Sequence, residues 1–426
     1  MLLYLCIVIV AVNGNTVSDR FIIDDQSHTN VTMPTTHLPH CSVNPKSPHP
    51  DLDRARCVLQ SYPLIDGHND LAELYLAYAN DSVNTVDLTS DLRLTWDKVL
   101  AQTDIPRLKQ GLLGAQFWSC WVTCHSQYVD AVRLTLEQLD TIKRFIKKYP
   151  DTFQYADTAQ GVIDAFDAGK IGSIIGLEGG HLIDSSLATL RMYYDLGVRY
   201  MTVTHSCNTP WADNWHVDEP GYNGTVLGGL TDFGKQVILE MNRLGIIVDL
   251  SHVSKSTMFA ALEVSRAPII FSHSSAFRLC NHHRNVQDDV LVKTKEEDGV
   301  VMVNFYTPFV VCPPNNKPTQ ELTDVADHID YIKNLIGVDH VGIGADYDGA
   351  ESFPVGLEDV SKYPDLFAEL VRRGWSDIDL QKLAGRNVLR VFREVEKVRD
   401  SLREMLPVEG RLPWTDLVDT KCRTAS

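Results

Sequence analysis

The segment Pro63-Leu64-Ile65-Asp66-Gly67-His68-Asn69-Asp70 ends an apolar run with an imidazole and a carboxylate two residues apart. Side chains at positions i and i+2 of a strand face the same way, so His68 and Asp70 are expected to point together. Three more potential metal ligands end later apolar runs in the same manner, namely Glu178, His252 and His273. Such ligands converge if the strands close into a barrel, because the carboxyl ends then share one face. The pattern favours a metallohydrolase.

From about Asp51 onward, short apolar runs alternate with longer amphipathic stretches. The predicted strands are 63–68, 115–121, 171–177, 199–204, 246–251, 268–273, 299–305 and 340–345. The stretches 134–149 and 230–244 each carry an apolar stripe with charged flanks and are predicted helices. Residues 366–395 are expected to hold two terminal helices. Eight strands separated by helices predict an α/β fold, a (β/α)8 TIM-like barrel, although a doubly wound open sheet would show the same periodicity.

The charge balance argues against a nucleic-acid partner. The 426 residues include 39 Lys and Arg against 56 Asp and Glu, a formal net charge of −17, and no block of basic residues. Binding to a phosphate backbone needs clustered cations. A hydrophobic content of 44% is that of an ordinary globular protein with a large core.

The first residues are typical of a secreted protein. An apolar run over residues 2–12 is too short to span a bilayer, so residues 1–14 are predicted to be a signal peptide. A polar, flexible leader is expected over residues 15–50, and the barrel with its C-terminal helices and tail over residues 51–426. Sequons at Asn30, Asn80 and Asn223 predict glycosylation. This sequence has no C-terminal hydrophobic tail, so a lipid anchor is not evident in it, and no transmembrane segment is expected. An extracellular protein is predicted, either secreted or membrane-associated.

Loss of Cys6 with the signal peptide leaves eight cysteines. An even number in a secreted chain favours disulfides, although the count alone allows about 105 full pairings.

The five strand-end ligands suit two metal ions better than one. Three imidazoles and two carboxylates are too many for a single open tetrahedral site, but they suit two ions that share a carboxylate. Glu178 is the only glutamate that ends a strand, so it is predicted to bridge the ions. His68 and Asp70 then complete the first site, and His252 and His273 complete the second.

Two further strand ends add polar groups, His205 and Asp346. Asp346 is expected to move a proton from the attacking water to a leaving amine, and His205 to stabilise the oxyanion. Arg284 lies in the loop after the sixth strand, where its guanidinium is in a position to hold a substrate carboxylate. From its local sequence alone, a solvated loop arginine is the simpler interpretation.

Several stretches together resemble one known family. They are Ile65-Asp66-Gly67-His68-Asn69-Asp70-Leu71, Glu178-Gly179-Gly180-His181, the segment from Thr204 to Asn214, Val248-Asp249-Leu250-Ser251-His252-Val253, Phe271-Ser272-His273-Ser274-Ser275-Ala276 and Gly342-Ile343-Gly344-Ala345-Asp346-Tyr347-Asp348-Gly349. In these segments the chain resembles the membrane (renal) dipeptidase family, a branch of the amidohydrolase-like metal-dependent barrels. The resemblance runs from about residue 60 to 425.

The resemblance implies a dipeptidase with two Zn2+ per subunit, held by the five ligands above. It also implies substrate-binding roles for His205, Arg284 and Asp346. Members of the family hydrolyse dipeptides, accept some D-residues at the C-terminal position, and act on cysteinyl-glycine conjugates and certain β-lactams.

The resemblance further implies the disulfides Cys124–Cys207 and Cys280–Cys312. Cys422 matches a cysteine that crosslinks two subunits, so a disulfide-linked homodimer is expected. The remaining three cysteines, Cys41, Cys57 and Cys120, have no obvious counterpart, and their odd number predicts one free thiol.

Two other functions share parts of this pattern. Barrel deaminases and cyclic-amide hydrolases usually begin with His-x-His and bridge their metals with a carbamylated lysine, whereas this chain has His68-x-Asp70 and Glu178. A secreted binding protein on the same scaffold would keep the fold without the activity. A chelator-sensitive assay on a panel of dipeptides separates an enzyme from a binding protein.

Overall fold

The computed structural model describes residues 41, 43–44, 46–96, 101–312 and 319–413. The predicted signal peptide, the Asn30 sequon and Cys422 lie outside the described residues. The compact unit that contains the barrel begins at Cys41. A disulfide joins Cys41 to Cys57 and so ties the end of the predicted leader to the first helix.

A closed ring of eight parallel strands forms the centre of the fold. The strands are β1 (Leu64–Asn69), β2 (Leu113–Cys120), β4 (Ile171–Glu178), β5 (Val198–Thr202), β6 (Ile247–Asp249), β7 (Ile270–Phe271), β8 (Val300–Val303) and β9 (Val341–Ile343). Pairing of β2 with β4 closes the ring. The predicted (β/α)8 barrel is confirmed, and the open sheet is excluded. A ninth short strand, β3 (Phe153–Tyr155), pairs with the first half of β4 and was not predicted.

Four strands are at least three residues shorter than their apolar runs suggest. β6, β7, β8 and β9 lie within the predicted 246–251, 268–273, 299–305 and 340–345. After β6, the Asp249 carboxylate accepts hydrogen bonds from the backbone N–H groups of Ser251 and Ser272, at 3.0 and 2.8 Å. The Asp249 side chain therefore replaces the strand-to-strand backbone hydrogen bonds after β6. The backbone is then free to turn toward the mouth of the barrel.

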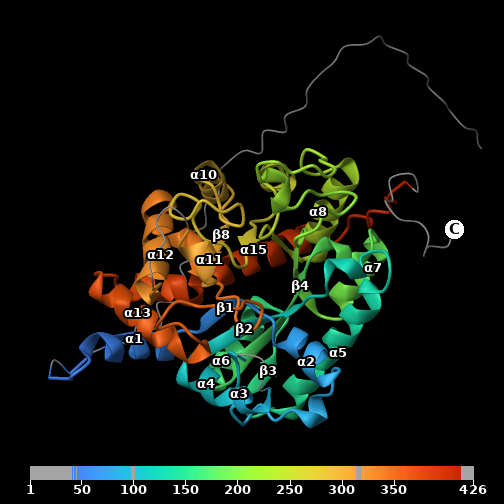
Figure 1. Ribbon diagram of the computed structural model, residues 1–426. Helices are drawn as coiled ribbons and strands as arrows, with labels where there is room; N and C mark the ends of the chain where they lie inside the picture. The colour runs from blue at the N-terminus through green and yellow to red at the C-terminus, as the bar shows by residue number, and fades with distance from the viewer. Residues whose placement is uncertain (1–40, 42, 45, 97–100, 313–318, 414–426) are drawn as a thin grey trace, which may run out of the picture. The chain divides into compact units, whose positions relative to one another are not determined.

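Helices surround the strands (Figure 1). They are α1 (Pro50–Ser61), α2 (Leu71–Ala79), α3 (Leu92–Thr95), α4 (Ile105–Gln110), α5 (Ala131–Lys148), α6 (Ala159–Asp167), α7 (Leu187–Asp195), α8 (Asp232–Leu244), α9 (Lys255–Val264), α10 (Asp288–Glu296), α11 (Thr307–Val310), α12 (Leu322–Ile336), α13 (Tyr363–Arg372), α14 (Asp377–Gln381) and α15 (Asn387–Ser401). The predicted helices 134–149 and 230–244 correspond to α5 and α8.

The prediction of two helices in 366–395 was wrong, because three lie there. Gly374 adopts a left-handed φ of 85° and ends α13, and the Ser376 side chain caps α14 by accepting a hydrogen bond from the Asp379 N–H. A π-helical turn, Lys382–Arg386, connects α14 to α15.

The barrel interior is a packed core below the polar mouth. Ile65, Phe117, Ile174, Ile247 and Met302, from five different strands, belong to one buried cluster that continues onto α15. Packing of this kind makes the barrel a rigid support, so groups at the strand ends hold fixed positions.

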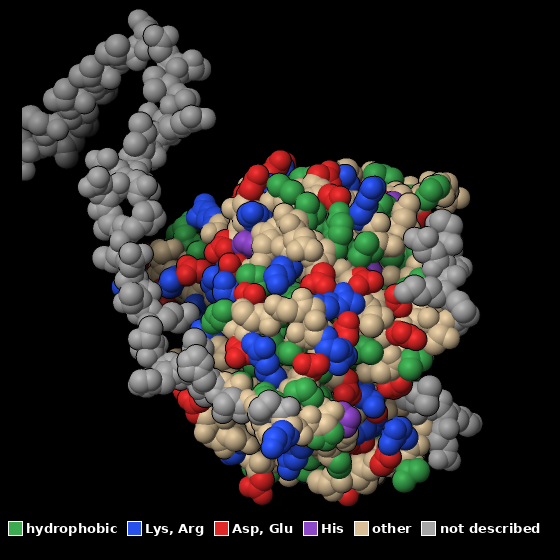
Figure 2. Space-filling model, turned by 90° about the vertical axis from the view of Figure 1, so that its left-hand side faces the viewer, with side chains coloured by type: hydrophobic (Ala, Val, Ile, Leu, Met, Phe, Trp, Pro, Cys, Tyr) green, Lys and Arg blue, Asp and Glu red, His purple; other side chains and the backbone are tan. Residues whose placement is uncertain are grey.

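Three disulfides connect described cysteines. The pairs Cys124–Cys207 and Cys280–Cys312 agree with the expectation from the family, and Cys120 is the buried free thiol. Among the described residues, no helix is long and apolar enough to cross a membrane. On the face shown in Figure 2, acidic and basic side chains are interspersed, and neither sign forms a large patch.

Candidate metal centre and active site

β1 delivers His68 and Asp70 to the mouth of the barrel, as the sequence predicts. Burial of the whole strand fixes its course. The Asp66 carboxylate locks its end by accepting hydrogen bonds from the His68 and Ala345 N–H groups, at 3.1 and 2.9 Å, and from the Tyr363 hydroxyl. The His68 Nε2 atom then lies 3.0 Å from Asp70 Oδ2.

Glu178 lies between this pair and two more histidines. Its Oε1 atom is 3.5 Å from His68 Nε2, 2.8 Å from His252 Nε2 and 3.2 Å from His273 Nε2. Two compact groups of potential ligands result, and both contain Glu178: one with His68 and Asp70, the other with His252 and His273. These are the two groups that the sequence predicts.

Asp346 also reaches this cluster. With His68 and His273 it forms a third compact group, and its Oδ1 lies 4.0 Å from His68 Nε2. Asn304 donates a hydrogen bond of 2.9 Å to the other carboxylate oxygen. Both Asp346 and His252 have left-handed φ angles, 70° and 66°, a backbone that most residues adopt only under strain. Strain of this kind concentrates at functional sites.

The donor set fits divalent cations. His68 Nε2 and Asp70 Oδ1 are buried without hydrogen-bond partners among the described residues. Burial raises the pKa of Glu178 to about 7; the charge of His68 lowers it, and the like charges of Asp70 and Asp346 add to the rise. Burial lowers the pKa of His252 and His273 well below the usual value, so both imidazoles are neutral, the form that binds metals.

Hydrogen-bonding residues orient the imidazoles from behind. His68 Nδ1 lies 2.8 Å from the Tyr200 hydroxyl, and His273 Nδ1 lies 2.8 Å from Ser272 Oγ. Partners of this kind fix the ring orientation and the tautomer of a metal-binding histidine. The sequence analysis missed both Tyr200 and Ser272. Ser272 directly precedes His273, which was a usable signal; Tyr200 reads as an ordinary core residue.

His205 and Arg284 also reach the cluster. The His205 Nε2 atom is 3.8 Å from Glu178 Oε1, and burial lowers the pKa of His205 well below the usual value. Arg284 is buried, not solvated as its local sequence suggests, and its Nη2 lies 2.9 Å from His252 Nε2. Burial lowers the pKa of Arg284 to about 10, so the guanidinium is still cationic at neutral pH.

A cavity of about 280 Å³, a size suited to a small molecule, is lined by the polar residues Asp70, Glu178, His205, His252, Arg284 and Asp346. Trp121, Trp215, Tyr306 and Phe309 form aromatic walls. Gly349 lies against the acidic side, where a Cβ atom would collide with the Asp70 carboxylate.

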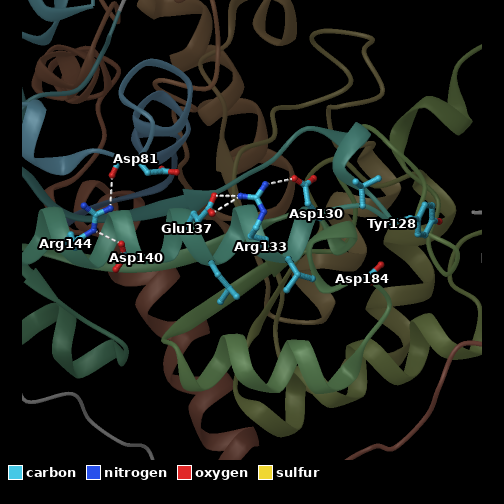
Figure 3. Close-up of a pocket in the computed structure, with 12 residues that line it drawn as sticks. Asp81, Tyr128, Asp130, Arg133, Glu137, Asp140, Arg144 and Asp184 are labelled. Carbon is cyan, nitrogen blue, oxygen red and sulfur yellow. Dashed lines mark hydrogen bonds and ion pairs between the residues drawn. The ribbon is translucent and has the colours of Figure 1, made fainter. Parts of the chain in front are cut away.

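A larger hollow of about 810 Å³ lies along α5, away from these ligands (Figure 3). Its two cations are already paired, Arg133 with Asp130 and Glu137, and Arg144 with Asp140. Among the described residues, the potential metal ligands therefore gather at the smaller cavity, and the larger hollow contains none of them.

Comparisons with known proteins agree with this geometry. Residues 52–405 match the family model "Membrane dipeptidase (Peptidase family M19)". The chain is 45% identical over 361 residues to Dipeptidase aclJ of Aspergillus oryzae, covering 83% of this chain and 82% of that protein. It is 43% identical over 371 residues to human Dipeptidase 3, covering 87% and 72%.

Solved structures of dipeptidases and metallopeptidases have a similar fold. A metallo peptidase from Rhodobacter sphaeroides, liganded with a phosphinate mimic of the dipeptide L-Ala-D-Ala, superposes with a TM-score of 0.69 at 25% identity, covering 78% of this chain and 99% of that one. The probable dipeptidase PvdM from Pseudomonas aeruginosa shares the fold, with a TM-score of 0.72 at 22% identity over 83% and 100% of the two chains. The chain belongs to the membrane dipeptidase family, peptidase family M19, and is a metallo-dipeptidase, a hydrolase that acts on peptide bonds.

Proposed function

We propose that this dipeptidase binds two Zn2+ ions, with His68 and Asp70 at the first, His252 and His273 at the second, and Glu178 at both. One observation carries the proposal: a single oxygen of Glu178 lies within 3.5 Å of His68 Nε2 on one side and of His252 and His273 Nε2 on the other. A bridging ligand must reach both groups in this way.

The reaction is hydrolysis of the one peptide bond of a dipeptide. Zinc ions held by these five residues would supply a Lewis acid for the scissile carbonyl and would acidify a water molecule, to a pKa of about 7, as the nucleophile. Asp346 accepts the proton of the attacking water and returns it to the leaving amine nitrogen. The hydrogen bond from Asn304 holds the Asp346 carboxylate in place for both transfers. Neutral His205 donates a hydrogen bond to the carbonyl oxygen as negative charge develops there.

Arg284 restricts the substrate by binding its C-terminal carboxylate. The guanidinium is buried beside His252, where a fork of two hydrogen bonds is worth more than in water. A cavity of about 280 Å³ leaves little room for a longer peptide. We extend the proposal to dipeptides with a C-terminal D-residue, to cysteinyl-glycine conjugates and to β-lactams, all of which are small and carry a carboxylate.

Metal removal tests the proposed function. We expect purified protein to contain two zinc ions per chain, to lose hydrolysis of a dipeptide panel after chelation, and to regain it when Zn2+ is added back. Metal analysis with the matching assay checks this. One ion per chain would contradict the bridging role of Glu178. Metal-loaded protein that cleaves no dipeptide would leave the binding-protein function as the better explanation.

We also propose that the chain is secreted after cleavage near residue 14, glycosylated, and linked into a homodimer through Cys422. The sequon residues Asn80 and Asn223 are both exposed, as glycan attachment requires. In a secretory host, N-glycosidase treatment should increase gel mobility, and N-terminal sequencing should find the first 14 residues absent. Wild-type protein should migrate as a dimer on a non-reducing gel and Cys422→Ser as a monomer. Monomeric wild-type protein would contradict the crosslink.

A further inference from the structure

Glu73 faces the active-site cavity but has no part in the proposed chemistry. It lies in the first turn of α2, where its backbone N–H donates a 2.9 Å hydrogen bond to the Asp70 carbonyl. Its half-buried side chain lines the cavity, as do Gly349 and Ala350. Within the described part of the chain, its carboxylate has no hydrogen-bond or ion-pair partner. A charge in this position is available to a ligand.

The surroundings of Glu73 are negative. Asp70, Glu178 and Asp346 line the same cavity as Glu73. Arg284 is the only Lys or Arg among the described residues that line the cavity. A cation entering from solvent would relieve this excess of negative charge.

Glu73 and Arg284 reach the cavity from different strand ends. Glu73 follows β1, whereas Arg284 lies in the loop after β7 and contacts His252, which follows β6. In the ring of eight strands, β1 is three places from β7 and four from β6. A dipeptide whose C-terminal carboxylate binds Arg284 would therefore extend its N-terminal residue toward a different part of the cavity wall, and Glu73 belongs to that wall.

The position of Glu73 suits a side chain of the substrate better than its α-ammonium group. The α-ammonium is two bonds from the scissile carbonyl carbon, so it must lie close to the Glu178 and Asp70 carboxylates. Glu73 is three residues beyond Asp70, a rise of about 4.5 Å along a helix. A lysine or arginine side chain is long enough to cover this distance while its backbone stays at the reacting centre.

We propose that Glu73 makes this enzyme prefer dipeptides whose N-terminal residue is lysine or arginine, by pairing with the cationic side chain. The inference rests on the proposed function, because it uses the substrate orientation that Arg284 sets. A charge-assisted hydrogen bond in a half-buried site is expected to favour the cationic substrate about tenfold.

The test compares Lys-Gly with norleucyl-Gly, which has a side chain of similar length without the ammonium group. We expect metal-loaded wild-type enzyme to show a kcat/KM about tenfold higher for Lys-Gly. In Glu73→Gln, kcat/KM should fall for Lys-Gly alone, so the preference disappears. The matched control is Glu263→Gln, which changes an exposed glutamate on α9 and should keep the preference.

If Glu73→Gln lowers kcat/KM equally for Lys-Gly and norleucyl-Gly, the inference is overturned and Glu73 is assigned to the α-ammonium group. If Glu73→Gln keeps the wild-type preference for Lys-Gly, the inference is also overturned. Equilibrium binding of uncleavable phosphinate analogues of the two dipeptides separates this inference from the proposed function. Suppose that the enzyme cleaves neither dipeptide, but wild type binds the lysyl analogue more tightly than the norleucyl analogue and Glu73→Gln binds both equally. The dipeptidase function then fails, while the role of Glu73 stands. Equal binding of the two analogues by wild type overturns the role of Glu73.

Discussion

Glu178→Gln is expected to lower kcat/KM for dipeptides more than about a thousandfold, because two bound metals together supply several kcal/mol of transition-state stabilisation and each 1.4 kcal/mol is a factor of ten. The amide is neutral and cannot balance two dications, so metal content should fall as well. His252→Ala should have a similar effect, since it removes one ligand of the second ion. Measurement of kcat/KM and of zinc per chain checks both variants.

Two controls separate this effect from general damage. Glu263→Gln and His125→Ala make the same chemical changes at exposed positions and should leave both quantities unchanged. Far-UV circular dichroism of Glu178→Gln should match wild type, because the packed barrel core does not include Glu178. Near-normal activity with a full metal complement would show that Glu178 is not a bridging ligand.

Arg284→Met is expected to lower kcat/KM about a hundredfold, mainly through KM, because it removes two charge-assisted hydrogen bonds to the substrate carboxylate. Metal content should not change, since Arg284 is not a proposed ligand. Steady-state kinetics on a dipeptide and on its C-terminal amide provide the measurement. Wild type should strongly prefer the free acid, and Arg284→Met should not.

The control for this variant lies on the same loop. Arg278→Met removes an exposed guanidinium and should keep the preference for the free acid. If Arg284→Met also keeps that preference, the carboxylate binds elsewhere.

The ligand set could be predicted from the sequence because one physical rule places it. Parallel strands in a closed barrel bring their carboxyl ends to one mouth, so a polar residue that ends an apolar run is expected there. His68, Glu178, His252 and His273 all follow this rule. Arg284 does not, because a loop of unknown course carries it, and its burial depends on contacts that no local pattern encodes.

Long-range contacts account for most of what the sequence analysis missed. Tyr200 contacts His68 across 132 residues, and Tyr363 reaches Asp66 across 297. The lengths of β6, β7, β8 and β9 were overestimated because their apolar runs continue beyond the strands; after β6, the Asp249 side chain takes over the hydrogen bonds. Cysteine spacing left the Cys41–Cys57 pair undetermined, since the count alone allows many pairings.

The two disulfides near the mouth lie in the loops and not in the strands. Cys207 is two residues from His205 and Cys280 is four from Arg284, so each disulfide anchors a loop that carries a residue proposed to bind the substrate. The proposed metal ligands depend on the barrel wall instead. Evolution or a protein engineer can therefore exchange the loops between these covalent anchors to obtain new specificities, while the hydrolytic machinery is inherited intact.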